Sequence, residues 1–322
     1  MSTIDFATYL KEEWKPALGC TEPASIAYAA AMAASVGGAG PITGLRLLCD
    51  PRIYKNCYAV GIPHSGHKVG IIWTLAIGSL LPDPSLKLEC FRRIDAKVLE
   101  QAEELISKGV VTVEVDTSRT DLFIEVLIER GEERSVAVIE GGHTRLTWLE
   151  ANGEPQKFET DGGGEADGFR RDLLARMSFE QMVEMSSSLR DHDRAALREG
   201  MQINEAIARH GLSLLPERFV DLSGQDLLTK VSRLVCGGVL ARMMGEDFVV
   251  MSLSGSGNKG IVCSVPLAVY GREAGHDPER IDRALALACL LTSATTHHLG
   301  TLSAVCGCSN AAGIGLAAGL TL

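Results

Sequence analysis

The sequence has few aromatic residues and no excess of positive charge. Phe, Trp and Tyr make up 5% of its 322 residues, whereas Gly alone contributes 34. We therefore expect helices that approach each other closely through small side chains. Lys and Arg number 31 against 41 Asp and Glu, a formal net charge of -10, with no long basic run. This acidic balance argues against nucleic acid and against an anionic membrane as the main partner.

The N-terminus, Met1–Phe6, lacks the basic and apolar regions of a signal peptide. The chain contains nine cysteines, an odd number. In a long chain without an export signal, such a count predicts reduced thiols and a cytoplasmic location. The cysteines are Cys20, Cys49, Cys57, Cys90, Cys236, Cys263, Cys289, Cys306 and Cys308.

The longest uncharged stretch, Leu299–Leu322, is long enough to span a bilayer. It is rich in Gly, Ala, Ser and Asn, however, and it lacks the aromatic and basic flanks of a membrane span. We therefore interpret it as a buried, tightly packed helix and expect no membrane partner.

The order of the expected elements predicts an α+β protein. Residues 1–40 read as N-terminal helices, and residues 41–151 as an α/β domain with a mostly antiparallel sheet. A polar, Gly-rich connector, 152–168, then precedes a mostly α-helical, catalytic-type domain over 169–322.

Periodicity places the individual elements within these segments. Helical spacing predicts helices over 3–15, 23–36, 70–81, 95–108, 179–188, 194–210, 227–244, 280–292 and 302–320. Runs rich in β-branched residues predict strands over 43–49, 56–60, 110–115, 121–129, 134–140 and 144–149.

The stretch Ala17-Leu-Gly-Cys-Thr-Glu-Pro23 precedes an Ala-rich helix. Thr21 or Glu22 can cap this helix, and Pro23 is tolerated in its first turn. Cys20 then lies at the positive end of the helix, which favours the thiolate as a nucleophile, base or metal ligand. The alternative is a small buried residue beside the cap.

The loop Ser252-Leu-Ser-Gly-Ser-Gly-Asn-Lys-Gly260 is polar and rich in glycine. Its glycines let backbone amides approach a ligand, and Ser254, Ser256, Asn258 and Lys259 can bind a carboxylate. The spacing is not that of a Walker loop or a dinucleotide fingerprint. An ordinary turn is the alternative.

Three further residues could carry chemistry. His143, between two expected strands, is a candidate general base or a surface residue of a hairpin turn. Cys306 and Cys308 do not match a zinc ribbon; they fit one cluster ligand with a neighbour, or two packing residues.

Taken together, these motifs follow one pattern. In order, they are Ala17–Pro23, the Gly61-Ile-Pro63 turn, His143-Thr144, Ser254–Asn258 and Val305–Gly319. Over essentially its whole length, the chain resembles the L-cysteine desulfidase family, iron–sulfur proteins related to the bacterial L-serine dehydratases.

The resemblance implies a β-elimination enzyme with a 4Fe-4S cluster that is held by three cysteines. One iron is open to the substrate and acts as a Lewis acid. A base removes the Cα proton, sulfide or water leaves, and aminoacrylate hydrolyses to pyruvate and ammonia.

The resemblance also implies residue roles. Cys308 is the expected metal ligand, with Cys306 as its alternate, and Cys20 is a ligand or the catalytic base that His143 assists. The expected contacts to the substrate, L-cysteine or L-serine, come from Thr21, Glu22, Ser254, Ser256, Asn258 and Lys259.

Two departures from the family pattern leave alternatives open. Family members continue for about a hundred residues beyond the Cys-Gly-Cys helix, with a further Cys pair that this chain is expected to lack. Gly66-His67 and Lys259 stand where Gly-rich or Gln-like residues are expected. The alternatives are an L-serine dehydratase, a non-catalytic thiol- or metal-binding or inactive truncated relative, and a small-molecule binding domain. A homodimer is compatible with the composition.

Overall fold

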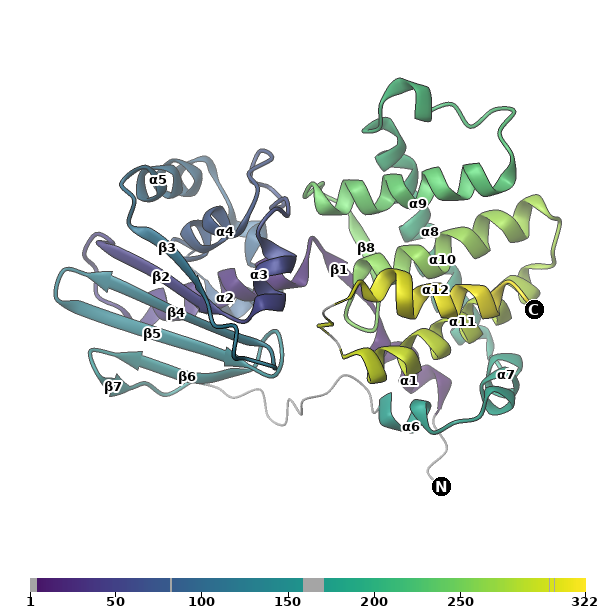
Figure 1. Ribbon diagram of the computed structural model, residues 1–322, viewed down its shortest axis with the longest axis horizontal. Coiled ribbons are helices and arrows are strands. Elements are labelled where there is room, and N and C mark those ends of the chain that lie inside the picture. Colours follow the sequence, from purple (N-terminus) through teal and green to yellow (C-terminus); the bar gives the residue numbers. More distant parts are fainter. Residues whose placement is uncertain (1–4, 82, 159–170, 301, 304) are drawn as a thin grey trace. The chain divides into compact units, whose positions relative to one another are not determined.

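The structure, a computed structural model, describes residues 5–81, 83–158, 171–300, 302–303 and 305–322. The chain divides into two compact units. We call Met1–Leu18, Gly168–Met243 and Phe248–Leu322 the helical unit, and Gly19–Asp167 with Met244–Asp247 the sheet unit. The predicted α+β class, with a sheet region followed by a helical region, is confirmed (Figure 1).

The sheet unit is built on a six-stranded sheet with the order β3-β2-β4-β5-β6-β7. Only the β2–β3 pair is parallel, so the sheet is mostly antiparallel, as predicted. Alternate residues of β2 are buried, which is the period-two pattern of a sheet with one covered face. The strands are β2 (Gly44–Cys49), β3 (Val111–Val115), β4 (Phe123–Arg130), β5 (Glu133–Glu140), β6 (Leu146–Ala151) and β7 (Glu154–Pro155).

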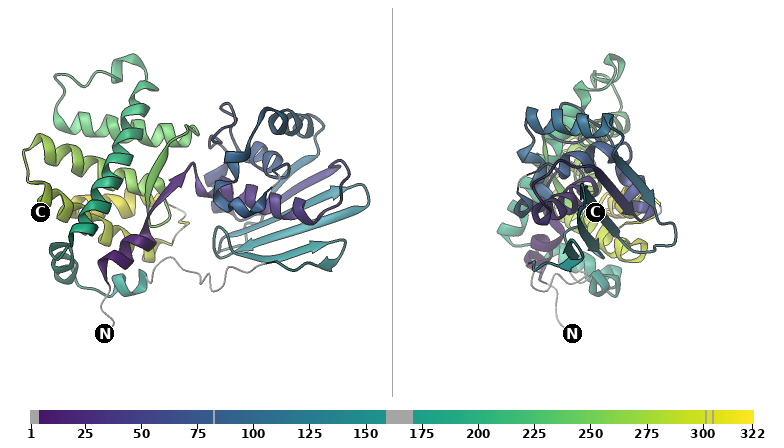
Figure 2. Two further views of the ribbon diagram at one scale, coloured as in Figure 1. Left: turned by 180° about the vertical axis from the view of Figure 1, so that it is seen from behind. Right: turned by 90° about the vertical axis from the view of Figure 1, so that its left-hand side faces the viewer.

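Helices cover one face of this sheet, as the views from the front and from behind show (Figures 1 and 2). α2 packs on β4, β5 and β6, and α4 packs on β2 and β3. A Cβ at Gly78 of α4 would lie 2.5 Å from the Cα of Ala27, so the two helices touch through small residues, as the composition predicts. The helices are α2 (Thr21–Val36), α3 (Pro51–Cys57), α4 (Ile71–Gly78), the 3-10 helix η1 (Pro84–Arg93) and α5 (Ala96–Ser107).

The helical unit surrounds a core to which α10 and α11 contribute almost continuous runs of buried residues. Its elements also include a short antiparallel pair, β1 (Trp14–Leu18) and β8 (Val249–Leu253). The helices are α1 (Phe6–Glu13), α6 (Arg171–Ala175), α7 (Phe179–Ser187), α8 (Asp191–Ser213), η2 (Glu217–Phe219), α9 (Leu227–Met243), α10 (Gly257–Glu273), α11 (Pro278–Leu299) and α12 (Gly307–Gly319).

Close contacts through glycine also shape the helical unit. A Cβ at Gly211 of α8 would overlap the carbonyl of Gly237 of α9. A Cβ at Gly315 of α12 would overlap Thr292 and the carbonyl of Ala288, both on α11. None of the helices within the described ranges is both long and apolar enough to cross a membrane.

Several local predictions from the sequence are wrong. The helix expected over 3–15 ends at Glu13, because Trp14–Leu18 pairs with β8 and Pro16 cannot continue a helix. The strand expected over 56–60 is replaced by α3, which starts at the Asp50-Pro51 pair. The Asp50 carboxylate caps this helix by accepting hydrogen bonds from the backbone N–H of Arg52 (2.8 Å) and of Ile53 (3.4 Å).

Further differences lie after residue 150. The expected connector begins with a tight turn at Asn152 and Gly153, both with positive φ, which joins β6 to β7. The connector residues 159–168 lie outside the described residues. The segment 169–322, expected to be helical, also contains the strand β8, and its last helix starts at Gly307 rather than at residue 302.

Candidate functional site

The polar loop at the start of α10 is a tight reverse turn. Ser254 (φ 49°) and Gly255 (φ 75°) both adopt the left-handed conformation. The N–H of Leu253 donates to the Ser256 carbonyl (3.0 Å), and the N–H of Ser256 donates back to the Leu253 carbonyl (3.1 Å). This is the geometry of a two-residue hairpin turn, and it delivers Ser256 to the N-cap position of α10.

Ser254 is the anchor of this turn. It is fully buried, and all of its polar groups face the interior. Its N–H donates to the carbonyl of Glu13 (3.0 Å), and its hydroxyl lies 2.6 Å from the hydroxyl of Ser293. Its carbonyl accepts a hydrogen bond from Lys259 Nζ (3.3 Å). Ser254 therefore holds the loop in place, and it is Ser256 that faces the neighbouring helix.

The loop meets the Cys-Gly-Cys motif at the start of α12. The Ser256 hydroxyl makes no capping hydrogen bond to α10 and lies 3.9 Å from Cys308 Sγ. Cys306 occupies the N-cap position of α12. The heads of α10 and α12 thus converge, and both present the positive end of a helix dipole.

The two thiols of this motif differ. Burial, with the neighbouring Cys306 as a second cause, raises the pKa of Cys308 to about 11. Partial burial acts in the same direction on Cys306, but backbone N–H groups of Ser309 and Cys308 outweigh it and lower the Cys306 pKa below its usual value. Cys306 is also exposed, so it is the more reactive thiol of the pair.

Lys259 brings a buried amine to the same place. Its side chain is 3% exposed, and Nζ also donates to the hydroxyl of Thr296 (3.1 Å). Burial, reinforced by the positive charge of Arg171, lowers the pKa of Lys259 from 10.5 to about 8. A Cβ at Gly307 would lie 3.0 Å from Lys259 Cε, so the lysine packs directly against the head of α12.

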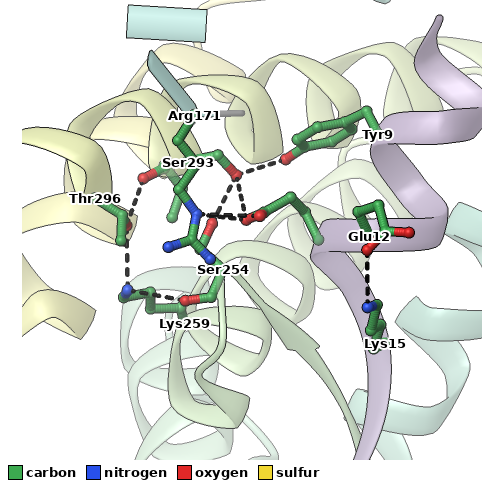
Figure 3. Close-up of polar contacts among 10 residues, drawn as sticks. Tyr9, Glu12, Lys15, Arg171, Ser254, Lys259, Ser293 and Thr296 are labelled. Carbon is green, nitrogen blue, oxygen red and sulfur yellow. Dashed lines mark hydrogen bonds and ion pairs between the residues drawn. The ribbon is translucent and has the colours of Figure 1, made fainter. Parts of the chain in front are cut away.

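A buried ion pair between Glu13 and Arg171 lies next to the loop (Figure 3). The Glu13 carboxylate accepts from Arg171 Nε at 3.0 Å on each oxygen. The Ser293 hydroxyl lies 3.4 Å from the same carboxylate and 2.8 Å from the hydroxyl of Tyr9. Four separate stretches of the chain thus converge on Ser254.

Asn258 is oriented by its own contacts in the helical unit. Its Oδ1 accepts a hydrogen bond from Arg242 Nη1 (3.1 Å), and its Nδ2 lies 3.5 Å from the sulfur of Met243. The amide is therefore fixed at the first turn of α10, where it was predicted to contribute to carboxylate binding.

The sheet unit contains a second group of predicted site residues, at the head of α2. Cys20, in an extended conformation, is the N-cap residue, so the prediction that Thr21 or Glu22 caps the helix is wrong. The Glu22 carboxylate instead accepts from Cys20 Sγ (2.9 Å), Thr21 Oγ1 (3.1 Å) and Asn56 Nδ2 (3.0 Å). The thiol proton of Cys20 therefore points at a carboxylate.

His143 belongs to this second group. It lies in the turn between β5 and β6, and its carbonyl accepts from the hydroxyl of Ser25 on α2 (2.6 Å). The residue is partly buried, and its Nε2 is buried without a hydrogen-bond partner among the described residues. Burial lowers the pKa of His143, while Glu22 and Asp50 act in the opposite direction. The lowered pKa therefore favours the neutral imidazole.

The predicted site residues thus form two groups, one in each unit. The helical unit brings together Ser254, Ser256, Asn258, Lys259, Cys306 and Cys308, and the sheet unit brings together Cys20, Thr21, Glu22 and His143. In the described ranges, no three His, Cys, Asp or Glu side chains gather so that they could hold a metal ion. The described side chains therefore do not by themselves supply the three thiolates of the expected cluster.

Sequence reasoning missed several members of the helical-unit group. Glu13 follows Phe6 and Leu10 on the buried stripe of α1, and a carboxylate on an apolar stripe is a recognisable signal. Ser293 and Thr296 are hydroxyl residues that follow the apolar middle of α11, residues 284–291. Arg171 carries no local signal, because its partner lies 158 positions away.

Comparison with known proteins gives the family of this chain. Residues 95–322 match the serine dehydratase alpha chain family. The chain belongs to this family. No solved structure matches it.

Similar proteins carry the designation UPF0597. A protein of Geobacter sulfurreducens is 35% identical over 316 residues, covering 96% of this chain and 73% of the relative. A protein of Desulfatibacillum aliphaticivorans is 32% identical, covering 95% and 74%. One from Caldanaerobacter subterraneus is 30% identical, covering 97% and 74%. The serine dehydratase alpha match includes the loop at α10 and the Cys-Gly-Cys motif.

Proposed function

We propose that this protein is a β-eliminating lyase that acts on a small L-amino acid, and that L-cysteine is its substrate. The products are pyruvate, ammonia and sulfide. The observation that carries the proposal is the convergence of two predicted motifs, where Ser256 contacts Cys308 and Lys259 packs against Gly307. Membership of the serine dehydratase alpha chain family supports the reaction class.

We assign the binding of the substrate carboxylate to the N-termini of α10 and α12. First-turn N–H groups of a helix have no intrahelical acceptor, and their dipoles favour an anion. Two such helix heads meet here; the Ser256 hydroxyl adds a polar donor, and the Lys259 side chain packs against the head of α12. An amino acid bound in this way presents its β-substituent near the Cys-Gly-Cys motif.

The group at the head of α2 is assigned the removal of the Cα proton. The Cys20 thiol already donates to Glu22, so the carboxylate is placed to receive the thiol proton and leave a thiolate base. His143, with an imidazole nitrogen that lacks a partner among the described residues, is the assisting base.

A 4Fe-4S cluster is the proposed cofactor, with Cys308 as a ligand and Cys306 as its alternate. The proton transfers assigned above need only the side chains of the chain itself. Anaerobic reconstitution followed by iron and sulfide analysis tests the cofactor. A Cys308→Ser variant that retains full iron and sulfide would remove Cys308 from the ligand set.

An anaerobic assay for pyruvate and sulfide with L-cysteine tests the function. Ser256→Ala is expected to raise KM about tenfold, because one hydrogen bond to a charged group is lost. The exposed Ser223 provides the matched control as Ser223→Ala. If the wild-type protein forms no pyruvate from any amino acid after reconstitution, the lyase proposal fails and a non-catalytic relative is favoured.

L-Serine is the second candidate substrate, because the matching family is that of the serine dehydratase alpha chain. A soft iron–sulfur site prefers a sulfur leaving group, which favours cysteine. The ratio of kcat/KM for the two amino acids decides between them. Thermal stabilisation by simple carboxylates in the absence of iron and of turnover would instead indicate a binding domain.

A further inference from the structure

The amine of Lys259 is held by two acceptors whose polarity is fixed. One is the backbone carbonyl of Ser254 (3.3 Å), which can only accept. The other is the Thr296 hydroxyl (3.1 Å), which already donates its own hydrogen to the carbonyl of Thr292 (2.7 Å). Lys259 must therefore donate to both, and each contact uses one N–H (Figure 3).

Among the described residues, this arrangement leaves one tetrahedral position on Nζ without a partner. A neutral amine has two N–H groups, and an ammonium has three. Both forms can keep the two donated hydrogen bonds unchanged, so the remaining position holds either a lone pair or a proton. A proton can thus leave from or return to this position without any rearrangement of the side chain.

The tip of the side chain lies against the head of α12. A Cβ at Gly307 would lie 3.0 Å from Cε and 3.6 Å from Nζ, so the glycine provides the space that the amine occupies. Four charged or titratable groups among the described residues act on the amine. They are Glu13 of α1, Arg171 of α6, Cys263 of α10 and Cys308 of α12.

We propose that Lys259 is the general acid of the elimination, donating the proton at its third position to the departing β-substituent. This inference rests on the proposed lyase function. As the Cβ–S or Cβ–O bond breaks, the bonding pair leaves with sulfur or oxygen. That atom takes the proton from the ammonium, which becomes the neutral amine. A proton from solvent restores the ammonium before the next turnover.

The electrostatics of the site agree with this role. The depressed pKa of about 8 leaves Lys259 mostly protonated at neutral pH and makes it a stronger acid than an ordinary lysine.

The leaving group provides the decisive test. Hydroxide is a very poor leaving group without a proton, sulfide is intermediate, and chloride needs no proton. Wild type and Lys259→Met should be compared with L-serine, L-cysteine and β-chloro-L-alanine under the same reconstitution. Lys259→Met should lose about 100-fold or more in kcat with L-serine, less with L-cysteine, and little with β-chloro-L-alanine. Lys15→Met, at an exposed lysine of the same unit, is the control.

Each outcome decides one question. An equal loss with all three substrates would show that Lys259 binds or supports rather than donates a proton, and would overturn the inference. Unchanged turnover of L-serine by Lys259→Met would do the same. A wild-type protein that eliminates from none of the three, β-chloro-L-alanine included, would instead overturn the lyase function itself.

A matched pair of glycine variants tests the position of the amine without altering Lys259. Gly307→Val puts a branched side chain where the tip of Lys259 lies, whereas a Cβ at Gly313 of the same helix meets nothing within 4 Å. Gly307→Val should reproduce the leaving-group pattern of Lys259→Met in weaker form, and Gly313→Val should behave as wild type. Identical kinetics for both variants with L-serine would contradict the assigned position.

Discussion

The two candidate groups hold their central side chains with opposite chemistry. In the sheet unit, the Glu22 carboxylate is surrounded by neutral donors, among them the thiol of Cys20. In the helical unit, the Lys259 amine donates to neutral acceptors, next to two helix heads. In the proposed function, the first group is assigned the acceptance of a proton and the second the donation of one. A β-elimination needs both, because one proton is removed at Cα and one is given to the leaving group.

The manner of support differs as well. Next to the helical-unit group lies a fully charged pair, Glu13 with Arg171, whereas the three side-chain hydrogen bonds to Glu22 described above come from uncharged groups. A buried charge depends strongly on its partner, but a carboxylate with several neutral donors loses only part of its stabilisation when one is removed. The four predictions below follow from this difference and run from the largest expected effect to the smallest.

Glu13→Gln should destabilise the protein by about 3–5 kcal/mol, because it leaves the Arg171 charge without its buried partner. Urea unfolding measures the change. The adjacent Glu12→Gln is the control, since Glu12 and Lys15 form an exposed pair for which about 0–1 kcal/mol is expected. Similar losses for the two variants would mean that the buried pair is no more important than the surface pair.

Lys259 should give the helical unit a distinct pH dependence. Its pKa is about 8 in the folded protein and 10.5 in the unfolded chain, so the unfolded state binds more protons between these values. Stability should therefore rise with pH across this window, by about 3 kcal/mol in total, and the rise should be missing in Lys259→Met. Urea titrations of both proteins from pH 7 to 10 test this. Parallel curves would contradict the buried-amine description.

Asn56→Ala removes one neutral donor from Glu22 in the sheet unit. The expected loss is about 1–2 kcal/mol, clearly below that of Glu13→Gln. Gln156→Ala, which removes an exposed amide donor of the same unit, should change stability by less than about 0.5 kcal/mol. If Asn56→Ala costs as much as Glu13→Gln, the contrast between charged and neutral support does not hold.

Cys20 and Cys306, the N-cap residues of α2 and α12, should differ in thiol reactivity. Cys306 is exposed and has a lowered pKa, whereas Cys20 is 6% exposed and donates to a carboxylate. Iodoacetamide at neutral pH should label Cys306 at least about tenfold faster than Cys20, as followed by peptide mass spectrometry. Cys236, exposed and distant in sequence from both motifs, provides the reference rate. Faster labelling of Cys20 would contradict the expected difference between the exposed and the buried thiol.

Periodicity in the sequence predicted most regular elements of the fold. The strands from residue 110 to 149 and the helices over 95–108 and 227–244 appear close to their expected bounds. Hydrophobic patterns of this kind reflect burial on one face, which the sequence records directly. The loop of Ser254 and the Cys-Gly-Cys motif were also recognisable, because their residue types are themselves unusual.

The sequence could not reveal the orientation of side chains or the contacts between residues that are far apart in the chain. The Asp50-Pro51 pair fits a turn as well as a helix start, and only the three-dimensional context selects the helix. Ser254 and Ser256 look equivalent in the sequence, yet the positive φ of Ser254 turns its polar groups inward. The pairing of Glu13 with Arg171 joins residues 158 positions apart, beyond the reach of any local pattern.

The Glu13–Arg171 pair has a topological consequence. The chain passes through Glu13 just before it leaves the helical unit after Leu18, and Arg171 is the first described residue after its return. The sheet unit is thus largely an insertion into the sequence of the helical unit. The ion pair links the two segments of the helical unit between which the insertion lies. Closing such a loop costs only about 0.6 kcal/mol more for each doubling of its length. Insertions of very different size could therefore be accommodated between these segments, provided that the Glu13–Arg171 pair is kept.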